Sequence, residues 1–225
     1  MMETELRELT AGFVPWSHWV RPVGESKVAL VATAGVYLKH GLQEPYDEGR
    51  PGGDPTFREF PVVVRSEDLA VSGSHPGPVQ EDLNLVFPLE RLRALADSGA
   101  IDAVAPFAYS FSGAVADPLP LLAGSGLSVA YRIRRMGADV ALLWASGEQG
   151  LLTAALVARL IELAGVPAVV VAAGAGADAL RGWGVPRGAI IRQPAAPGDA
   201  EGQQRLLLAA LEAAWDLHEP GVIEL

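Results

Sequence analysis

Short apolar runs alternate with longer segments of helical spacing along most of this 225-residue chain. The runs are rich in β-branched residues, and they lie at 27–34, 103–107, 140–144, 168–171 and 189–192. Strands that are apolar on both faces are typical of parallel sheets with helices on each side. Because strands and helices also alternate in order, we expect a single α/β domain over 1–225. Its core would be a doubly wound parallel sheet with helices on both faces.

The segments between these runs have the apolar spacing of amphipathic helices. They lie at 88–99, 119–136, 151–164 and 201–217. Gly99 and Gly137 close the first two, as glycines often do just past a helix end. The stretch 36–82 is different, because it is rich in Gly, Pro, Asp and His and has only a weak strand candidate at 61–65. Irregular stretches of this length are often functional, so we expect an ordered, substrate-side loop excursion there.

The composition excludes several classes of function. A formal net charge of −10 argues against a broad nucleic-acid or anionic-membrane surface, which needs clustered Lys and Arg. The absence of cysteine excludes disulfides, thiolate metal sites and thiol nucleophiles in this chain. The acidic start resembles no secretory signal, and no apolar run reaches the ~20 residues of a membrane helix. We expect a cytoplasmic protein that forms a homo-oligomer.

In doubly wound sheets, ligands bind at the carboxyl ends of the strands. This rule brings the segments 33–35, 107–113, 145–150 and 172–176 to one common rim. Thr33 and Gly35 end the first strand, although Gly35 also suits a simple turn. Tyr109 and Ser110 follow a strand, and their hydroxyls suit a polar substrate. The alternative for Tyr109 is a buried hydroxyl that satisfies a structural hydrogen bond.

The turn at 146–150 is the best candidate for chemistry. Ser146 and Gln149 fit a capping box, which on its own would only start the helix. The same geometry exposes N–H groups that favour a carboxylate or phosphate, and Gly147 and Gly150 allow close approach. Glu148 would then act as general base or acid, although the helix dipole favours a first-turn Glu without any function.

Two further groups lie in the excursion. Asp54 and Arg58 form either a local salt bridge or a carboxylate clamp, since the guanidinium fork binds carboxylates bidentately. His40 and His75 have carboxylates nearby in sequence and form a weak candidate for a divalent metal site. Their spacing matches no known motif, and solvated loop residues are the more common explanation. We expect no cofactor, with a divalent metal as the minority alternative.

An ordered set of motifs carries a family resemblance. The stretches that match lie at 14–16, 28–36, 38–39, 43–47, 53–59, 82–92, 105–106 and 109–111, and the resemblance runs from Val14 to about Ala173. On these stretches the chain resembles the selenoprotein B subunit family of the glycine, sarcosine and betaine reductases, which also includes a D-proline reductase subunit. Each piece is weak alone, but the ordered set is specific.

The resemblance implies the fold and the substrate-side excursion, but not the usual chemistry. In reductase members the strand-to-helix turn reads Sec/Cys-x-x-Cys-His-Gln-Thr. Aligned on 156–159, this chain places Gly147 and Gly150 at the two redox positions and keeps Thr153. The segment 74–78 also departs from the family's His-x-x-Tyr-Asp pattern. Selenol or thiol attack on an activated amine therefore does not carry over.

Three classes of function remain open. The first is an enzyme without redox cysteine, acting on a small amino-acid-like or amine substrate by C–N or C–S bond chemistry. Its catalytic candidates are Glu148, Tyr109 and Ser110, and its candidates for binding a small carboxylate or amine ligand are Thr33, Gly35, Asp54, Arg58, Ser146, Gly147, Gln149 and Gly150. The second is a non-catalytic binding or regulatory subunit that partners a Cys- or Sec-bearing homologue or a redox protein. The third is a metal-dependent lyase or hydrolase.

Overall fold

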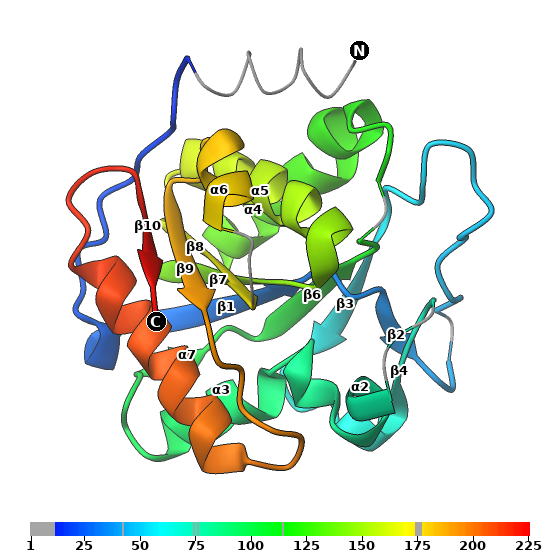
Figure 1. The fold of residues 1–225 in the computed structure, drawn as a ribbon, viewed down its shortest axis with the longest axis horizontal. Helices are drawn as coiled ribbons and strands as arrows, with labels where there is room; N and C mark the ends of the chain where they lie inside the picture. The colour runs from blue at the N-terminus through cyan, green and yellow to red at the C-terminus, as the bar shows by residue number, and fades with distance from the viewer. Residues whose placement is uncertain (1–11, 42, 74, 76, 114, 174–176) are drawn as a thin grey trace.

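An eight-stranded sheet forms the centre of the molecule (Figure 1). The computed structural model describes residues 12–225 apart from 42, 74, 76, 114 and 174–176, and it leaves the side chains of 149, 177 and 178 undescribed. The strands are β1 (Lys27–Ala32), β3 (Phe57–Pro61), β5 (Ala103–Val104), β6 (Phe107–Phe111), β7 (Val140–Ala145), β8 (Ala168–Ala173), β9 (Arg187–Ile191) and β10 (Gly221–Glu224). The order across the sheet is β10-β9-β8-β7-β1-β6-β3, and β5 also pairs with β1.

The sheet is doubly wound, as the sequence predicts. Every pairing in it is parallel except that of the edge strand β3 with β6. One face is covered by α4 (Gly126–Arg135), α5 (Gly147–Leu163) and α6 (Ala177–Gly182), and the other by α3 (Leu89–Asp97) and α7 (Ala200–Trp215). No helix in the described part of the chain has both the length and the apolar character needed to cross a membrane.

The continuous apolar runs arise because both faces of the central strands are buried. In β1, Ala29 and Val31 pack toward α4 and α5, whereas Val28 and Leu30 pack toward α3 and α7. All four side chains have no exposed surface. Successive side chains of a strand point to opposite faces, so a strand between two helical layers requires apolar residues at every position.

The stretch 36–82 contains more regular structure than a loop. It holds β2 (Val36–Leu38), β3, the 3₁₀-helix η2 (Ser66–Asp68), β4 (Leu69–Val71) and the short helix α2 (Gly77–Glu81). β2 and β4 form a separate antiparallel pair. The strand expected at 61–65 was placed four residues too late. The carbonyls of Val62 and Val64 accept hydrogen bonds from the Arg93 guanidinium, at 2.8 and 2.9 Å, instead of joining a strand ladder.

Several other boundaries differ from the prediction. The run at 103–107 is split at Ala105 and Pro106 into β5 and β6. The helix after β7 begins at Gly147 instead of 151, and α4 is preceded by a π-helical turn, η4 (Leu121–Ser125). Short 3₁₀-helices, η1 (Val23–Glu25) and η3 (Leu83–Leu85), and the strand β10 were not expected. Gly99 and Gly137 do close their helices, with φ of 77° and 65°.

Candidate functional site

The sheet reverses its strand order at β1, which lies between β6 and β7. In doubly wound folds, ligands bind in the crevice beside the carboxyl ends of the strands at this switch point. Thr33 directly follows β1, and Ser146 directly follows β7. The fold therefore brings these two predicted residues together at the place where a ligand is expected.

Protein atoms fill the space between these two strand ends. The backbone N–H of Ser146 donates to Oγ1 of Thr33 over 3.1 Å, and Thr33 is only 1% exposed. Gly150 lies so close that a Cβ there would stand 2.4 Å from Oγ1 of Thr33. A Cβ on Gly113 would stand 3.0 Å from the Thr33 carbonyl oxygen. The glycines at 113 and 150 therefore allow the segment after β6 and the first turn of α5 to pack directly against the end of β1.

The outer side of the same turn is open. Gly147 has a φ of +65°, which favours glycine, and no heavy atom lies within 4 Å of a Cβ placed there. Glu148 is exposed in the first turn of α5. The turn therefore offers an outward carboxylate and exposed backbone next to a helix N-terminus.

The predicted capping box is not formed. Ser146 is the N-cap residue, but its side chain makes no cap hydrogen bond, and the side chain of Gln149 lies outside the described residues. A capping box needs helical backbone directly after the N-cap, and the left-handed φ of Gly147 breaks that geometry. Ser146 instead uses its backbone N–H to bind Thr33.

Tyr109 and Ser110 lie within β6, not after it as predicted. Because neighbouring strand residues face opposite sides, the two hydroxyls are separated by the sheet. Ser110 is fully buried, and its Oγ accepts a hydrogen bond from the N–H of Val36 over 2.9 Å. Tyr109 packs edge-on against Phe57, with ring centroids 5.8 Å apart. Burial and the adjacent Glu59 carboxylate raise the pKa of the Tyr109 hydroxyl.

Gly35 lies in the turn between the carboxyl end of β1 and β2, the first strand of the excursion. Its φ is +68°, its N–H donates to the carbonyl of Phe111, and its carbonyl accepts from Ser72 N–H. Tyr46, which sequence reasoning did not single out, donates its hydroxyl hydrogen to the carbonyl of Ser110 over 2.5 Å. The family-like stretch at 43–47, which contains Tyr46, is the signal from which it could have been predicted.

Asp54 and Arg58 order the loop around them. The Asp54 carboxylate accepts hydrogen bonds from Thr56 and from the N–H of Asp47. Burial alone would raise its pKa, but these hydrogen bonds outweigh burial and lower the pKa of Asp54. Arg58 donates to the Glu44 carbonyl over 2.9 Å, and its guanidinium lies 4.3 Å above the Tyr46 ring. Neither charge is directed at the Thr33–Ser146 contact.

The two histidines lie in different surroundings. His40 is exposed, whereas Nε2 of His75 lies 3.1 Å from the carbonyl oxygen of Ala34. Within the residues that the structure describes, no three His, Asp or Glu side chains come together as a metal site. The metal-dependent alternative therefore has no preassembled ligand set in this part of the chain.

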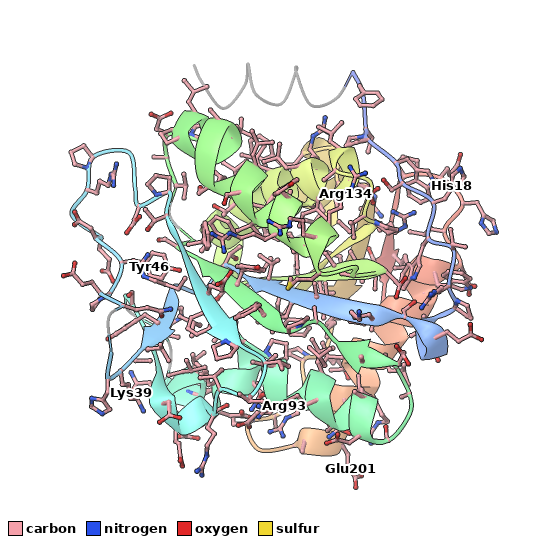
Figure 2. All side chains as sticks on the ribbon, turned by 180° about the vertical axis from the view of Figure 1, so that it is seen from behind. His18, Lys39, Tyr46, Arg93, Arg134 and Glu201 are labelled. Atoms are coloured by element: carbon pink, nitrogen blue, oxygen red, sulfur yellow. The ribbon has the colours of Figure 1, made fainter. Side chains whose placement is uncertain are left out.

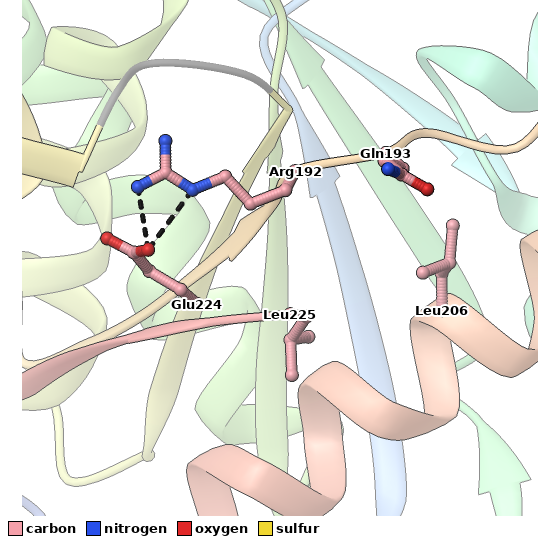
Figure 3. A pocket seen from close by; sticks show the side chains of 5 residues that line it. All are labelled: Arg192, Gln193, Leu206, Glu224 and Leu225. Carbon is pink, nitrogen blue, oxygen red and sulfur yellow. Dashed lines mark hydrogen bonds and ion pairs between the residues drawn. The ribbon is translucent and has the colours of Figure 1, made fainter.

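A hollow of about 480 Å³ lies farther along the same edge of the sheet, beside the ends of β9 and β10. Figure 3 shows its lining, in which Arg192 holds the Glu224 carboxylate through Nε and Nη2 at 3.1 and 2.6 Å. Gln193, Leu206 and Leu225 complete the wall. None of the site residues predicted from the sequence lines this hollow.

Comparison with known proteins connects the chain to a reductase. It is 32% identical over 160 residues to D-proline reductase subunit gamma of Acetoanaerobium sticklandii. The match covers 70% of this chain and 64% of the length of that relative. No family model and no solved structure matches the chain. The similarity supports a relationship to the subunits of this reductase.

Proposed function

We propose that this chain is a subunit of a reductase-type assembly in which it supplies fold and binding surface, not the sulfur redox pair. The similarity to a D-proline reductase subunit supports the reductase relationship. Gly147 and Gly150 stand where the resembled family carries its selenium and sulfur, and the 225 residues contain no cysteine. A partner chain, either a Cys- or Sec-bearing homologue or a redox protein, would carry the electrons.

The packing of Gly150 against Thr33 carries this proposal. A Cβ at position 150 would lie 2.4 Å from Oγ1 of Thr33, and real Cβ atoms do not approach so closely. A thiol at this position would therefore require Thr33 to move. The switch-point crevice is occupied by protein atoms at the position where a redox residue would have to project.

The outward part of the turn supports a role in contact with another molecule. Gly147 leaves open space and Glu148 is exposed. The first turn of a helix leaves backbone N–H groups without intrahelical partners, which favours anionic groups such as carboxylates, and the 17-residue helix α5 begins at this turn. The Glu148 carboxylate suits pairing with a basic residue of a partner chain, and the open backbone at Gly147 suits a small carboxylate ligand held between two chains.

Native mass spectrometry of protein purified from its source organism tests the proposal. The expected result is a stoichiometric complex with a chain that contains cysteine or selenocysteine. Glu148→Arg should weaken that complex, whereas Glu81→Arg, at an exposed acidic position on α2, should leave it intact. Substrate turnover by the purified chain alone would contradict the proposal.

A second candidate is an acid–base enzyme acting on a small amino-acid-like or amine substrate. The observation that favours it is the exposed Glu148 carboxylate beside the open Gly147. Under this alternative, Glu148→Gln abolishes turnover while the protein remains folded. Unchanged kinetics and ligand affinity in that variant would reject the role of Glu148.

A further inference from the structure

The helical segment before β7 carries an unusual outer face. It runs from Leu119 through η4 and α4, and an apolar residue recurs at every fourth position. We call this set the α4 stripe; its members are Leu119, Ala123, Leu127 and Tyr131. Leu119 is 65% exposed, Leu127 48% and Tyr131 61%. Single exposed apolar residues are common, but contiguous ones mark interaction sites.

The opposite side of the same helical segment packs into the hydrophobic core. Leu121, Val129 and Ile133 have no exposed surface and pack in the cluster that includes α5. A Cβ on Gly126 would lie 2.7 Å from Cδ1 of Leu160, so the helices approach closely there. Figure 2 looks onto α4, with Arg134 labelled near its end, and no other described helix or strand lies in front of it. The α4 stripe therefore faces away from the protein.

Charges of opposite sign flank the α4 stripe. Asp117 precedes it, and its Oδ1 accepts a hydrogen bond from Leu119 N–H over 3.1 Å. Arg134 and Arg135 follow it and are exposed. Within the described residues neither arginine forms an ion pair, and the Arg135 guanidinium lies 5.8 Å from the Tyr131 ring. The face is thus acidic at its start, apolar in the middle and basic at its end.

We infer that the α4 stripe is the interface with a second copy of this chain, joined by an antiparallel contact of the two α4 helices. In an isologous pair, each surface meets itself across a two-fold axis. Antiparallel pairing brings Arg135 of each copy to Asp117 of the other, whereas parallel pairing would place arginine against arginine. Leu127 is midway between Leu119 and Arg135 in sequence, so the two copies of Leu127 meet near the axis.

A second copy in the antiparallel arrangement pairs the acidic and the basic end of each α4 stripe within a single interface. A different partner would have to offer a basic group to Asp117, an apolar surface to the α4 stripe and an acidic group to Arg135. Two helix faces of this size bury less than the ~1,200 Å² of a standard stable interface. We therefore expect a reversible dimer with a dissociation constant of roughly micromolar size. The α4 stripe shares no residue with the 146–150 turn, so this inference stands independently of the proposed function.

Sedimentation equilibrium measures the dimer directly. Leu127→Glu should raise the dissociation constant at least about tenfold, because central apolar residues dominate interface energies. Leu163→Glu is the matched control, because Leu163 is also exposed (63%) but lies on α5 outside the α4 stripe. It should leave the constant unchanged. A monomer at every concentration, or equal effects of the two changes, would overturn the inference.

The cysteine-free sequence allows a second, geometric test. Two Cα atoms must come within about 7 Å to form a disulfide. Leu127→Cys should therefore cross-link to its own copy under mild oxidation, whereas Leu163→Cys should not. Leu119→Cys and Arg135→Cys should link only when the two variants are mixed. Self-linking of Leu119→Cys would show parallel pairing, and a complex formed only with a different chain would also overturn the inference.

Discussion

The two ends of the parallel sheet use polar groups in opposite ways. At the amino end, Glu162 and Arg187 form an ion pair in which both residues are almost completely buried, at 3% and 2% exposure. At the carboxyl end, the contact between β1 and β7 is made by Thr33, Ser146 and Gly150, which carry no charge. The ionisable group of that turn, Glu148, is exposed.

The buried pair at the amino end is held from several sides. Glu162 accepts a hydrogen bond from Ala168 N–H over 2.9 Å, and Arg187 donates to the Ser17 carbonyl over 2.7 Å. The Arg187 guanidinium lies 3.5 Å above the Trp16 ring. Burial raises the pKa of Glu162 against the opposing charge of Arg187. The segment around Ser17 closes this end of the sheet.

Buried charge at the amino end of this sheet therefore has a structural role. Perturbed ionisable groups often indicate active sites, although structural ion-pair networks perturb them equally. Here the most buried ion pair lies at the end of the sheet where doubly wound folds do not bind ligands. At the carboxyl end, by contrast, the Glu148 carboxylate is exposed and the space around Gly147 is open.

The largest expected effect is on the amino end. Glu162→Ala leaves the Arg187 charge buried without its partner, which should lower the free energy of unfolding by about 3–5 kcal/mol. Replacing both residues, with Glu162→Leu and Arg187→Met, should recover much of that loss. Urea unfolding followed by circular dichroism measures both variants. If Glu162→Ala lowered the free energy of unfolding by less than about 1 kcal/mol, the buried ion pair would not stabilise the amino end as we propose.

The next effect concerns the closed packing at the carboxyl end. Gly150→Ala forces a methyl group against Thr33 and should cost about 1–3 kcal/mol, as overpacking does. Gly77→Ala is the matched control, because no heavy atom lies within 4 Å of a Cβ there. The same urea titration applies. If Gly150→Ala were as stable as the control, the crevice would have room for a side chain, and the proposed function would lose its main support.

Asp82 is an exception to the contrast between the two ends, because it is a buried charge near the carboxyl end. It accepts hydrogen bonds from Gly198 N–H at 2.9 Å and from Nε2 of Gln203 at 2.6 Å. Burial opposes ionisation, but these bonds dominate and lower the pKa of Asp82. Its contribution to stability is therefore present above the ordinary Asp pKa of about 3.9. It is lost as pH falls through the lower pKa of the folded state.

Asp82→Asn should consequently reduce stability by about 1–2 kcal/mol at pH 7 and flatten the loss of stability below about pH 4. Thermal unfolding between pH 2.5 and 7 measures this dependence. Asp102→Asn, at an exposed acidic position, serves as control and should keep the wild-type slope. An unchanged acid slope in Asp82→Asn would assign the acid sensitivity to other carboxylates.

The smallest effect on stability is expected at Glu148. Glu148→Gln removes a charge that favours the helix N-terminus, which is worth about 0.3–1 kcal/mol at an exposed site. Urea unfolding should therefore detect little change. The same variant should alter ligand or partner binding if the turn is a recognition surface. A decrease of more than about 2 kcal/mol in the free energy of unfolding would show that Glu148 has a structural role, as Glu162 does.

From the amino-acid sequence we could predict the doubly wound class of the sheet, the approximate positions of its main strands along the chain and the absence of cysteine thiol chemistry. These features follow from local periodicity and composition, which need no knowledge of distant contacts. It also placed Thr33 and the 146–150 turn on one rim, because parallel strands end at the same edge. The reductase relationship came from ordered motifs.

The contacts made by the predicted site residues could not be predicted from the sequence, because their partners are distant along the chain. Thr33 and Ser146 are 113 positions apart, and their hydrogen bond fills a crevice that the sequence suggested was open. Tyr109 and Ser110 are neighbours in sequence, yet strand register sends them to opposite faces of the sheet. The guanidinium of Arg58 is bound by carbonyls of a loop whose path depends on the whole excursion. Residue types indicate which chemistry is possible, but burial and long-range partners decide which groups remain free to perform it.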